Sequence, residues 1–262
     1  MNPLDAGFEC IEFYFLIFAR LVGVFVQAPL FGRPKGVPAP VQVGYSLAIS
    51  LVMYSILPIP KHLPENAVEY GFAIAGQVSI GLMLGFASYM VAAGLQFAGE
   101  IIDVQMGLSI AANFDPSAGG TVNMIRQFQF RLALLVWIFI HGDYFFFKAI
   151  RRSYELIPPD TSALTQGAVF KLVDMTSGLF VMGLELSAPV VAALFITNVA
   201  LGLLNRAAQQ FNVFMISFPL SILIGMGVMI LGLGTLMSRA IPNLYSHLNH
   251  DMMELIMALK AK

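Results

Sequence analysis

Three polar side chains fall on one face of an expected helix inside an otherwise apolar stretch. Gln96, Glu100 and Asp103 are spaced at i, i+4 and i+7, so a continuing helix places them in one stripe, with Gln105 nearby. A carboxylate at membrane depth costs at least about 2.5 kcal/mol and usually marks a path for ions or substrate, or a paired interface. The spacing also allows a helix that has left the membrane and carries a solvated stripe.

The stripe opens a polar segment that extends to Pro116. Gly107, Gly119 and Gly120 flank bulky apolar residues in its middle, among them Ile110 and Phe114. At membrane depth such a segment must be buried in protein or line a water-filled cavity. A loop of this composition can occlude a pore, although an ordinary connector has a similar composition.

The elements around this segment are apolar and of membrane length. The chain has 262 residues, of which 58% are hydrophobic and 11% charged, too few polar residues to coat a soluble globule. A net charge of −1 argues against a nucleic-acid partner. Short alternating strands are absent, so we expect an all-α integral membrane protein with about six long, partly kinked hydrophobic helices. The apolar runs cover residues 11–30, 41–57, 67–98, 127–150, 167–204 and 211–240.

We expect a single membrane domain over residues 1–262. It consists of hydrophobic helices in 1–98, the polar loop in 99–126, further hydrophobic helices in 127–240 and an amphipathic helix in 241–262. The last helix is predicted from apolar residues near 3.6-residue spacing, and it either lies on the bilayer or docks on a partner. The Lys and Arg distribution favours cytoplasmic termini only if all six runs cross, so the topology is left undetermined.

Charged and helix-breaking residues interrupt the apolar runs. Arg20, Arg131, Asp143 and Glu185 lie inside them, and opposite charges at depth usually pair across helices or with another subunit. Pro189 predicts either a kinked long helix or two shorter ones. The small residues at both ends of the Gly81–Gly85 pattern, which are four positions apart, predict close helix packing.

Catalytic and metal-binding arrangements are not found. Cys10, the single cysteine, cannot form an internal disulfide and has no neighbouring cysteine for a metal site. His141 and Asp143, at i and i+2, point apart on a helix. We therefore predict neither enzyme activity nor a cofactor or metal, and a membrane-embedded hydrolase or transferase is disfavoured.

Motifs in a fixed order extend over nearly the whole chain. They are Arg20-Leu-Val-Gly23 with Pro29 and Pro38; Gly99-Glu-Ile-Ile-Asp103 with Gln105, Gly107 and Asp115-Pro116; Glu185-Leu-Ser-Ala-Pro189; and Gly202-Leu-Leu-Asn-Arg206 with Gln209 and Asn212-Val-Phe214. This set resembles the FliR/SctT family of type III export-gate proteins, and it fits the flagellar branch better than the injectisome branch.

The resemblance implies a non-enzymatic subunit of a helical export gate. One copy would assemble with several FliP-like and FliQ-like proteins, next to FlhB-like and FlhA-like export components, in the bacterial inner membrane at the flagellar basal body. Unfolded export substrates would pass through the gate. The implied fold is rich in helical hairpins whose apolar faces contact other subunits, together with membrane lipid.

The resemblance also places a plug in the loop after the Gly-Glu-x-x-Asp motif, at about residues 106–121. Ile110 and Phe114 would be its bulky stoppers, whereas Asn113 is more polar than the family pattern. The implied plug residues are Met106, Gly107, Ile110, Asn113, Phe114, Asp115 and Pro116. The expected buried polar or subunit-contact residues are Arg20, Gln96, Glu100, Asp103, Gln105, Arg131, Glu185, Pro189, Asn205, Arg206 and Gln209.

The second hypothesis is an ion-coupled secondary transporter of small solutes. In it, Glu100, Asp103 and Glu185 would couple ions to transport, and the chain would act alone. No inverted repeat is visible between the two halves of the sequence, which lowers the weight of a repeat-built transporter.

Overall fold

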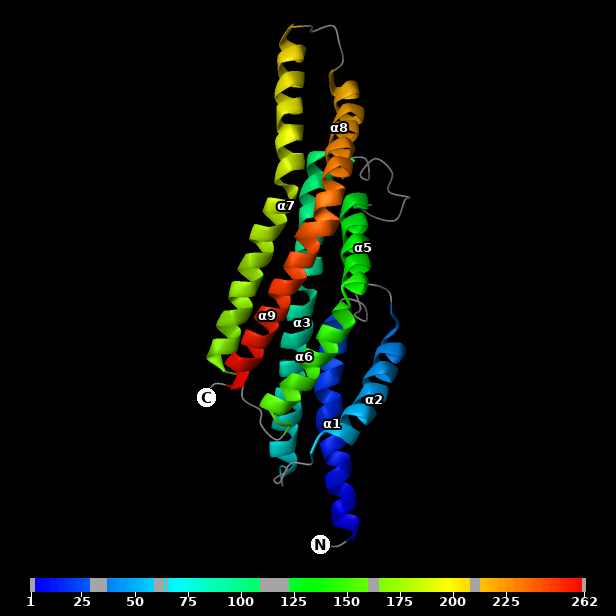
Figure 1. Cartoon of the computed structure of the whole chain (residues 1–262), viewed down its shortest axis with the longest axis vertical. Helices are drawn as coiled ribbons and strands as arrows, with labels where there is room; N and C mark the ends of the chain where they lie inside the picture. The colour runs from blue at the N-terminus through cyan, green and yellow to red at the C-terminus, as the bar shows by residue number, and fades with distance from the viewer. Residues whose placement is uncertain are drawn as a thin grey trace. The chain divides into compact units, whose positions relative to one another are not determined.

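The computed structural model describes residues 3–28, 37–58, 64, 66–108, 123–159, 165–207 and 213–260, and within these ranges every regular element is helical (Figure 1). The prediction of an all-α membrane protein is thereby confirmed. The elements are α1 (Pro3–Gln27), α2 (Ala39–Ile56), α3 (Ala67–Gln105), α5 (Met124–Phe139), α6 (Gly142–Leu156), α7 (Gln166–Ala207), α8 (Val213–Thr235), a π-helical turn (Leu236–Ala240) and α9 (Ile241–Lys260).

Within the described residues, five helices are long and apolar enough to cross a membrane, and the number rises to six if α5 and α6 count as one span. These two helices are bent by 75° at their junction. The apolar run predicted over 127–150 therefore forms two helices that meet at a sharp bend. His141 adopts a left-handed conformation with φ of 55°, which ends α5 before Gly142 begins α6.

The two alternatives for the fifth run are resolved in favour of one long helix. Pro189 lies inside α7, which continues from Gln166 to Ala207. Proline has no backbone N–H, so the carbonyl of Glu185 loses its usual partner four residues later. The third run is longer than predicted, because α3 continues past Ala98 to Gln105.

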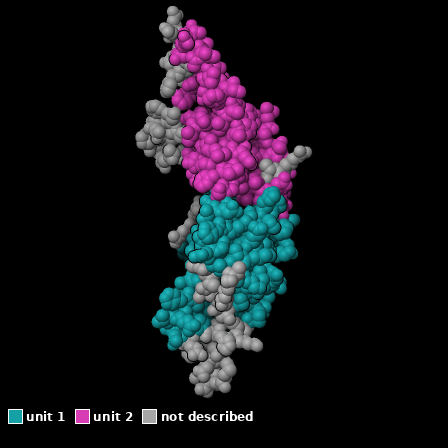
Figure 2. All heavy atoms as spheres, turned by 90° about the vertical axis from the view of Figure 1, so that its left-hand side faces the viewer, with its two compact units in different colours: residues 1–90, 141–176, 245–262 teal, residues 91–140, 177–244 magenta. Residues whose placement is uncertain are grey.

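Contacts divide the chain into two compact units, coloured teal and magenta in Figure 2. Unit 1 contains residues 1–90, 141–176 and 245–262, and unit 2 contains residues 91–140 and 177–244. The helices α3 and α7 each contribute residues to both units.

Unit 1 is built on a close crossing of α1 and α3. A Cβ atom at Gly81 would strike the backbone carbonyl of Arg20, and one at Gly85 would lie 2.5 Å from the carbonyl oxygen of Val24. The small residues thus let the two backbones touch, as the sequence pattern predicts. Fully buried side chains fill the space around this crossing, among them Phe13, Leu16, Ile17, Leu21, Phe25, Ile80 and Leu84.

A buried arginine joins three helices of unit 1. Arg20 of α1 donates hydrogen bonds to Gln77 Oε1 of α3 at 2.7 Å, to Ser153 Oγ of α6 at 3.2 Å and to the carbonyl of Ile157 at 2.8 Å. Its guanidinium carbon lies 4.2 Å from the ring centre of Tyr154. An opposite charge or another subunit was the expected partner of Arg20, but these acceptors are neutral groups of the same chain. They compensate the desolvation of the guanidinium.

The C-terminal helix docks on the chain itself. Its predicted apolar face is buried, and Lys171 of α7 forms ion pairs with Asp251 at 2.9 Å and Glu254 at 2.6 Å. Thr165 also donates a hydrogen bond to the carbonyl of Leu259 at 3.2 Å. These contacts give α9 a partner within unit 1. The buried apolar residues of α9 include Leu248, Met252, Leu255, Ile256 and Leu259.

Candidate functional site at the end of helix α3

The last two turns of α3 pack into the core of unit 2. Ile102 and Met106 are buried together with Ile125 of α5 and with Val190 and Leu194 of α7. The first half of the polar segment is therefore helix, and its residues at i, i+3, i+4 and i+7 from Gly99 share one face. This face carries Asp103 next to the apolar residues, so the packing determines which groups the carboxylate meets.

Asp103 caps the N-terminus of α5. Its side chain is buried, with 1% exposure; Oδ1 accepts a hydrogen bond from the backbone N–H of Ile125 at 3.1 Å, and Oδ2 accepts one from that of Arg126 at 3.0 Å. N–H groups in the first turn of a helix have no partner inside the helix. The N-cap residue Asn123 provides no side-chain hydrogen bond. A carboxylate from another helix therefore supplies the cap and also interacts favourably with the helix dipole.

The rest of the Gly-Glu-x-x-Asp motif brings α5 close to α3. A Cβ atom at Gly99 would lie 2.6 Å from the Cα atom of Arg126, so only glycine permits this approach. Glu100 forms an ion pair with Arg126 at 3.5 Å, with side chains 48% and 41% exposed. An ion pair this exposed contributes at most about 1 kcal/mol. We call the contacts of Gly99, Glu100 and Asp103 with Ile125 and Arg126 the Asp103 clamp.

Helix α3 ends immediately after the clamp. Gly107 has φ of +77°, a conformation that costs glycine nothing, and its N–H bonds to the carbonyl of Val104 at 3.1 Å. A Cβ atom here would lie 2.7 Å from the ring of Phe218. Met106 is buried against Gly225. In the structure Met106 is thus a core residue at the base of the predicted plug.

The residues of the clamp flank the predicted plug segment in the sequence. The described chain ends at Leu108, five residues after Asp103, and begins again at Asn123, two residues before Ile125. Ile110, Asn113, Phe114, Asp115 and Pro116 lie outside the described residues. Their role in a plug remains a prediction.

The remaining predicted contact residues are mostly on the surface. Gln96 is half-buried, and Arg131 donates a hydrogen bond to Gln127 at 3.5 Å. Within the described ranges, no ion pair links Arg131, Glu185 or Arg206 to another residue. Gln209 lies outside these ranges. The exposed residues of the set are Gln105, Arg131, Glu185, Pro189, Asn205 and Arg206.

Sequence reasoning missed the partners of two charged residues. Gln77, which binds Arg20, is a polar residue inside an apolar run and could have been noticed for that reason. The pairing of Lys171 with Asp251 and Glu254 joins positions about 80 residues apart and left no local signal. Where the structure describes the chain, no group of three or more His, Cys, Asp or Glu side chains could hold a metal ion.

Comparison with known proteins identifies the family. The model of the family described as bacterial export proteins, family 1, matches residues 11–245. The chain belongs to this family. The resemblance to FliR/SctT proteins is thus confirmed, and this family 1 export protein is a membrane component of a bacterial export apparatus.

Curated relatives of the family 1 export protein cover most of its length. It is 33% identical over 212 residues to the flagellar biosynthetic protein FliR of Bacillus subtilis (strain 168), which covers 80% of this chain and 81% of the relative. It is 30% identical to the flagellar biosynthetic protein FliR of Escherichia coli (strain K12), and the match covers 84% of this chain and 83% of the relative. The FliR of Pectobacterium carotovorum subsp. carotovorum is 29% identical, and the match covers 93% of this chain and 90% of the relative.

Proposed function

We propose that this chain is a core subunit of the flagellar type III protein export gate in the bacterial inner membrane at the basal body. With FliP-like and FliQ-like subunits it forms the channel through which unfolded flagellar substrates are exported. FlhB-like and FlhA-like components are its further partners. The proposal is supported by the flagellar names of relatives that match over most of the chain. The chain acts as a conduit and performs no covalent chemistry.

The observation that carries the gating part of the proposal is the Asp103 clamp. Because Asp103 binds the first turn of α5, the helices that precede and follow segment 109–122 are joined at one place in unit 2. Movement of the segment between them would then leave α3 and α5 in position. We propose that it closes the pore, with Gly107 as the first residue that rotates.

The surface of unit 2 supports assembly with other subunits. The apolar stretch Met215–Ser238 runs through α8 into the π-helical turn; 11% of its 18 most apolar consecutive residues are buried, and Leu231 is 85% exposed. Glu185 and Arg206 are exposed among apolar neighbours on α7. Lipid can cover the apolar side chains, but it does not satisfy charges at membrane depth. Partner subunits would cover the exposed apolar side chains and supply charges opposite to those of Glu185 and Arg206.

The test of assembly is co-purification from mild detergent, followed by mass spectrometry. Glu185→Ala and Arg206→Ala should each reduce recovery of the FliP-like and FliQ-like subunits, whereas Asp174→Ala, an exposed acidic residue on the same helix, should leave it unchanged. Normal recovery with both variants would contradict the interface role.

The transporter hypothesis makes the opposite prediction for the isolated chain. Purified alone and reconstituted in liposomes, a gate subunit shows no saturable solute uptake. Saturable uptake that is lost in Glu185→Gln would favour the transporter and contradict our proposal.

A further inference from the structure

We infer that helix α6 of unit 1 binds the headgroup of an anionic phospholipid in a cavity of about 520 Å³. Small-molecule sites commonly have volumes of about 300–1,000 Å³. The described residues that line the cavity all belong to unit 1: Met53 of α2, Met253 of α9, and Tyr144, Phe147, Lys148, Arg151, Arg152 and Glu155 of α6.

One face of α6 supplies the charge of the cavity. Lys148, Arg151 and Arg152 are spaced at i, i+3 and i+4, so all three cations lie on one side of the helix. Among the described residues that line the cavity, Glu155 is the one carboxylate, so these residues carry a net charge of about +2. An anionic ligand is therefore favoured.

The opposite face of α6 holds the helix in place. Phe146, Ile150, Ser153 and Tyr154 are buried, and the hydroxyl group of Tyr154 donates a hydrogen bond to the carbonyl of Ile17 at 2.8 Å. The cations thus project from a fixed helix, so the ligand does not have to organise them.

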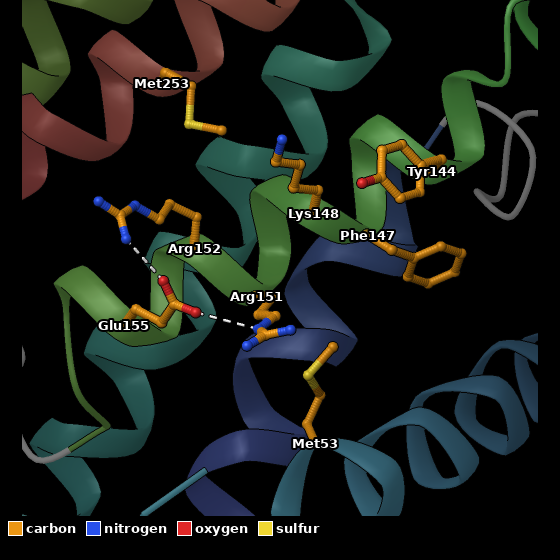
Figure 3. A pocket seen from close by; sticks show the side chains of 8 residues that line it. All are labelled: Met53, Tyr144, Phe147, Lys148, Arg151, Arg152, Glu155 and Met253. Atoms are coloured by element: carbon orange, nitrogen blue, oxygen red, sulfur yellow. Dashed lines mark hydrogen bonds and ion pairs between the residues drawn. The ribbon is translucent and has the colours of Figure 1, made fainter. Parts of the chain in front are cut away.

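Glu155 lies between the guanidinium groups of Arg151 and Arg152. It accepts hydrogen bonds from Arg151 Nε at 3.1 Å and from Arg152 Nη1 at 2.8 Å, and Figure 3 shows it between them. Each guanidinium carries five N–H donors, so each has further donors to offer to phosphate oxygens. Lys148 lies one turn away, with its ammonium group 6.0 Å from the centre of the Tyr144 ring.

The apolar part of the lining indicates a lipid as the source of the phosphate. Met53 and Met253 lie on opposite sides of α6 in Figure 3, and Phe147 extends the apolar wall. A free phosphate ion would gain nothing from these side chains, whereas glycerol and acyl groups would pack against them. Tyr144 and Phe145 are exposed on the same helix, as aromatic residues often are at membrane interfaces.

The test measures lipid binding to the purified full-length chain by native mass spectrometry and by thermal stabilisation in detergent. We expect phosphatidylglycerol to bind more tightly than phosphatidylcholine. Lys148→Gln should weaken phosphatidylglycerol binding about fivefold, and Lys148→Gln with Arg151→Gln about 25-fold, from the roughly 1 kcal/mol that each cation contributes near an anionic surface. Arg152 keeps its pairing with Glu155 in both variants.

Two further variants separate binding from folding. Lys260→Gln, which removes an exposed lysine outside the cavity, should leave binding unchanged. Glu155→Gln should tighten phosphatidylglycerol binding several-fold, a gain that a damaged fold does not produce.

Three results would overturn the inference. One is equal binding of the two lipids. Another is equal stabilisation by inorganic phosphate, which would indicate a site for a free anion. The third is that a protein co-purifies with the wild-type chain but not with Lys148→Gln, while lipid binding is unchanged. This result would indicate an interface for an acidic protein segment.

Discussion

Asp103 and Arg126 are joined by a hydrogen bond from the backbone N–H of Arg126 to Oδ2 of Asp103, 3.0 Å long, which ties the end of α3 to the first turn of α5. The carboxylate binds Ile125 in the same way. Because backbone N–H groups donate both hydrogen bonds to the carboxylate, the contact depends on the position of α5 rather than on any particular side chain. This relationship underlies the following two predictions.

Asp103→Asn should loosen the start of α5. The amide keeps the size of the side chain, but it removes the negative charge and turns an NH₂ group toward an N–H group. We expect a loss of about 1–3 kcal/mol in local stability. Hydrogen exchange at the amides of Ile125 and Arg126 measures it. The control is Glu100→Gln, whose exposed ion pair should cost no more than about 1 kcal/mol. Unchanged exchange in Asp103→Asn would show that the cap is not formed.

Gly99→Ala should displace α5 from α3. The new methyl group would meet the backbone of Arg126, which cannot move aside as a side chain can. Overpacking of this kind costs about 1–3 kcal/mol. Gly178→Ala is the matched control, because a Cβ atom there meets nothing within 4 Å and alanine favours a helix interior by about 0.5–1 kcal/mol. Thermal unfolding in detergent should separate the two variants, and equal midpoints would contradict the close approach at Gly99.

Arg20→Ala should destabilise unit 1 strongly. The change leaves a cavity and removes the donor for Gln77, Ser153 and the Ile157 carbonyl, so we expect a loss of at least about 3 kcal/mol. Arg131→Ala removes an exposed arginine and should change stability by less than about 0.5 kcal/mol. Both are measured by denaturant unfolding in micelles. Similar curves for the two variants would exclude a stabilising role for the Arg20 contacts.

The docking of α9 should weaken in acid. The ammonium group of Lys171 lowers the pKa of Glu254 below its ordinary value. A group with a lowered pKa in the folded state stabilises above its unfolded pKa, and this contribution disappears as the pH falls through the folded value. Asp251, Asp174 and His250 lie in the same ion-pair cluster. Proteolysis near the C-terminus, followed from pH 7 to 3, should accelerate below about pH 4.5.

Glu254→Gln tests the assignment of that effect. The variant should be cleaved faster at pH 7 and should show a smaller change on acidification. An unchanged pH profile would attribute the effect to other carboxylates.

The sequence was sufficient to predict the helices because membrane length and apolar composition are local properties. The Gly81–Gly85 pattern also predicted a close helix crossing, and Gly23 of α1 faces it. The break at His141 was not predicted, because a left-handed histidine carries no strong local signal. The apolar residues on both sides of His141 were therefore predicted to form one continuous run.

The partners of the polar residues could not be predicted from the sequence. Asp103 binds backbone N–H groups, which every residue other than proline possesses, so no residue type marks the partner. Arg20 lies 57 positions before Gln77 and 133 before Ser153, and only the packing of three helices brings these groups together. The stripe of Gln96, Glu100 and Asp103 was correctly placed on one helix, but the packing of α5 makes only its last residue buried.

Ion conductance of the assembled export complex in a planar bilayer measures whether segment 109–122 closes the channel. Ile110→Gly with Phe114→Gly keeps the loop length and removes its bulk, and Ala111→Ser with Ala112→Ser is the control. Both variants should assemble normally, and leakage of small ions should increase in the first only. Unchanged conductance of an intact complex carrying the glycine substitutions would contradict closure of the channel by this segment.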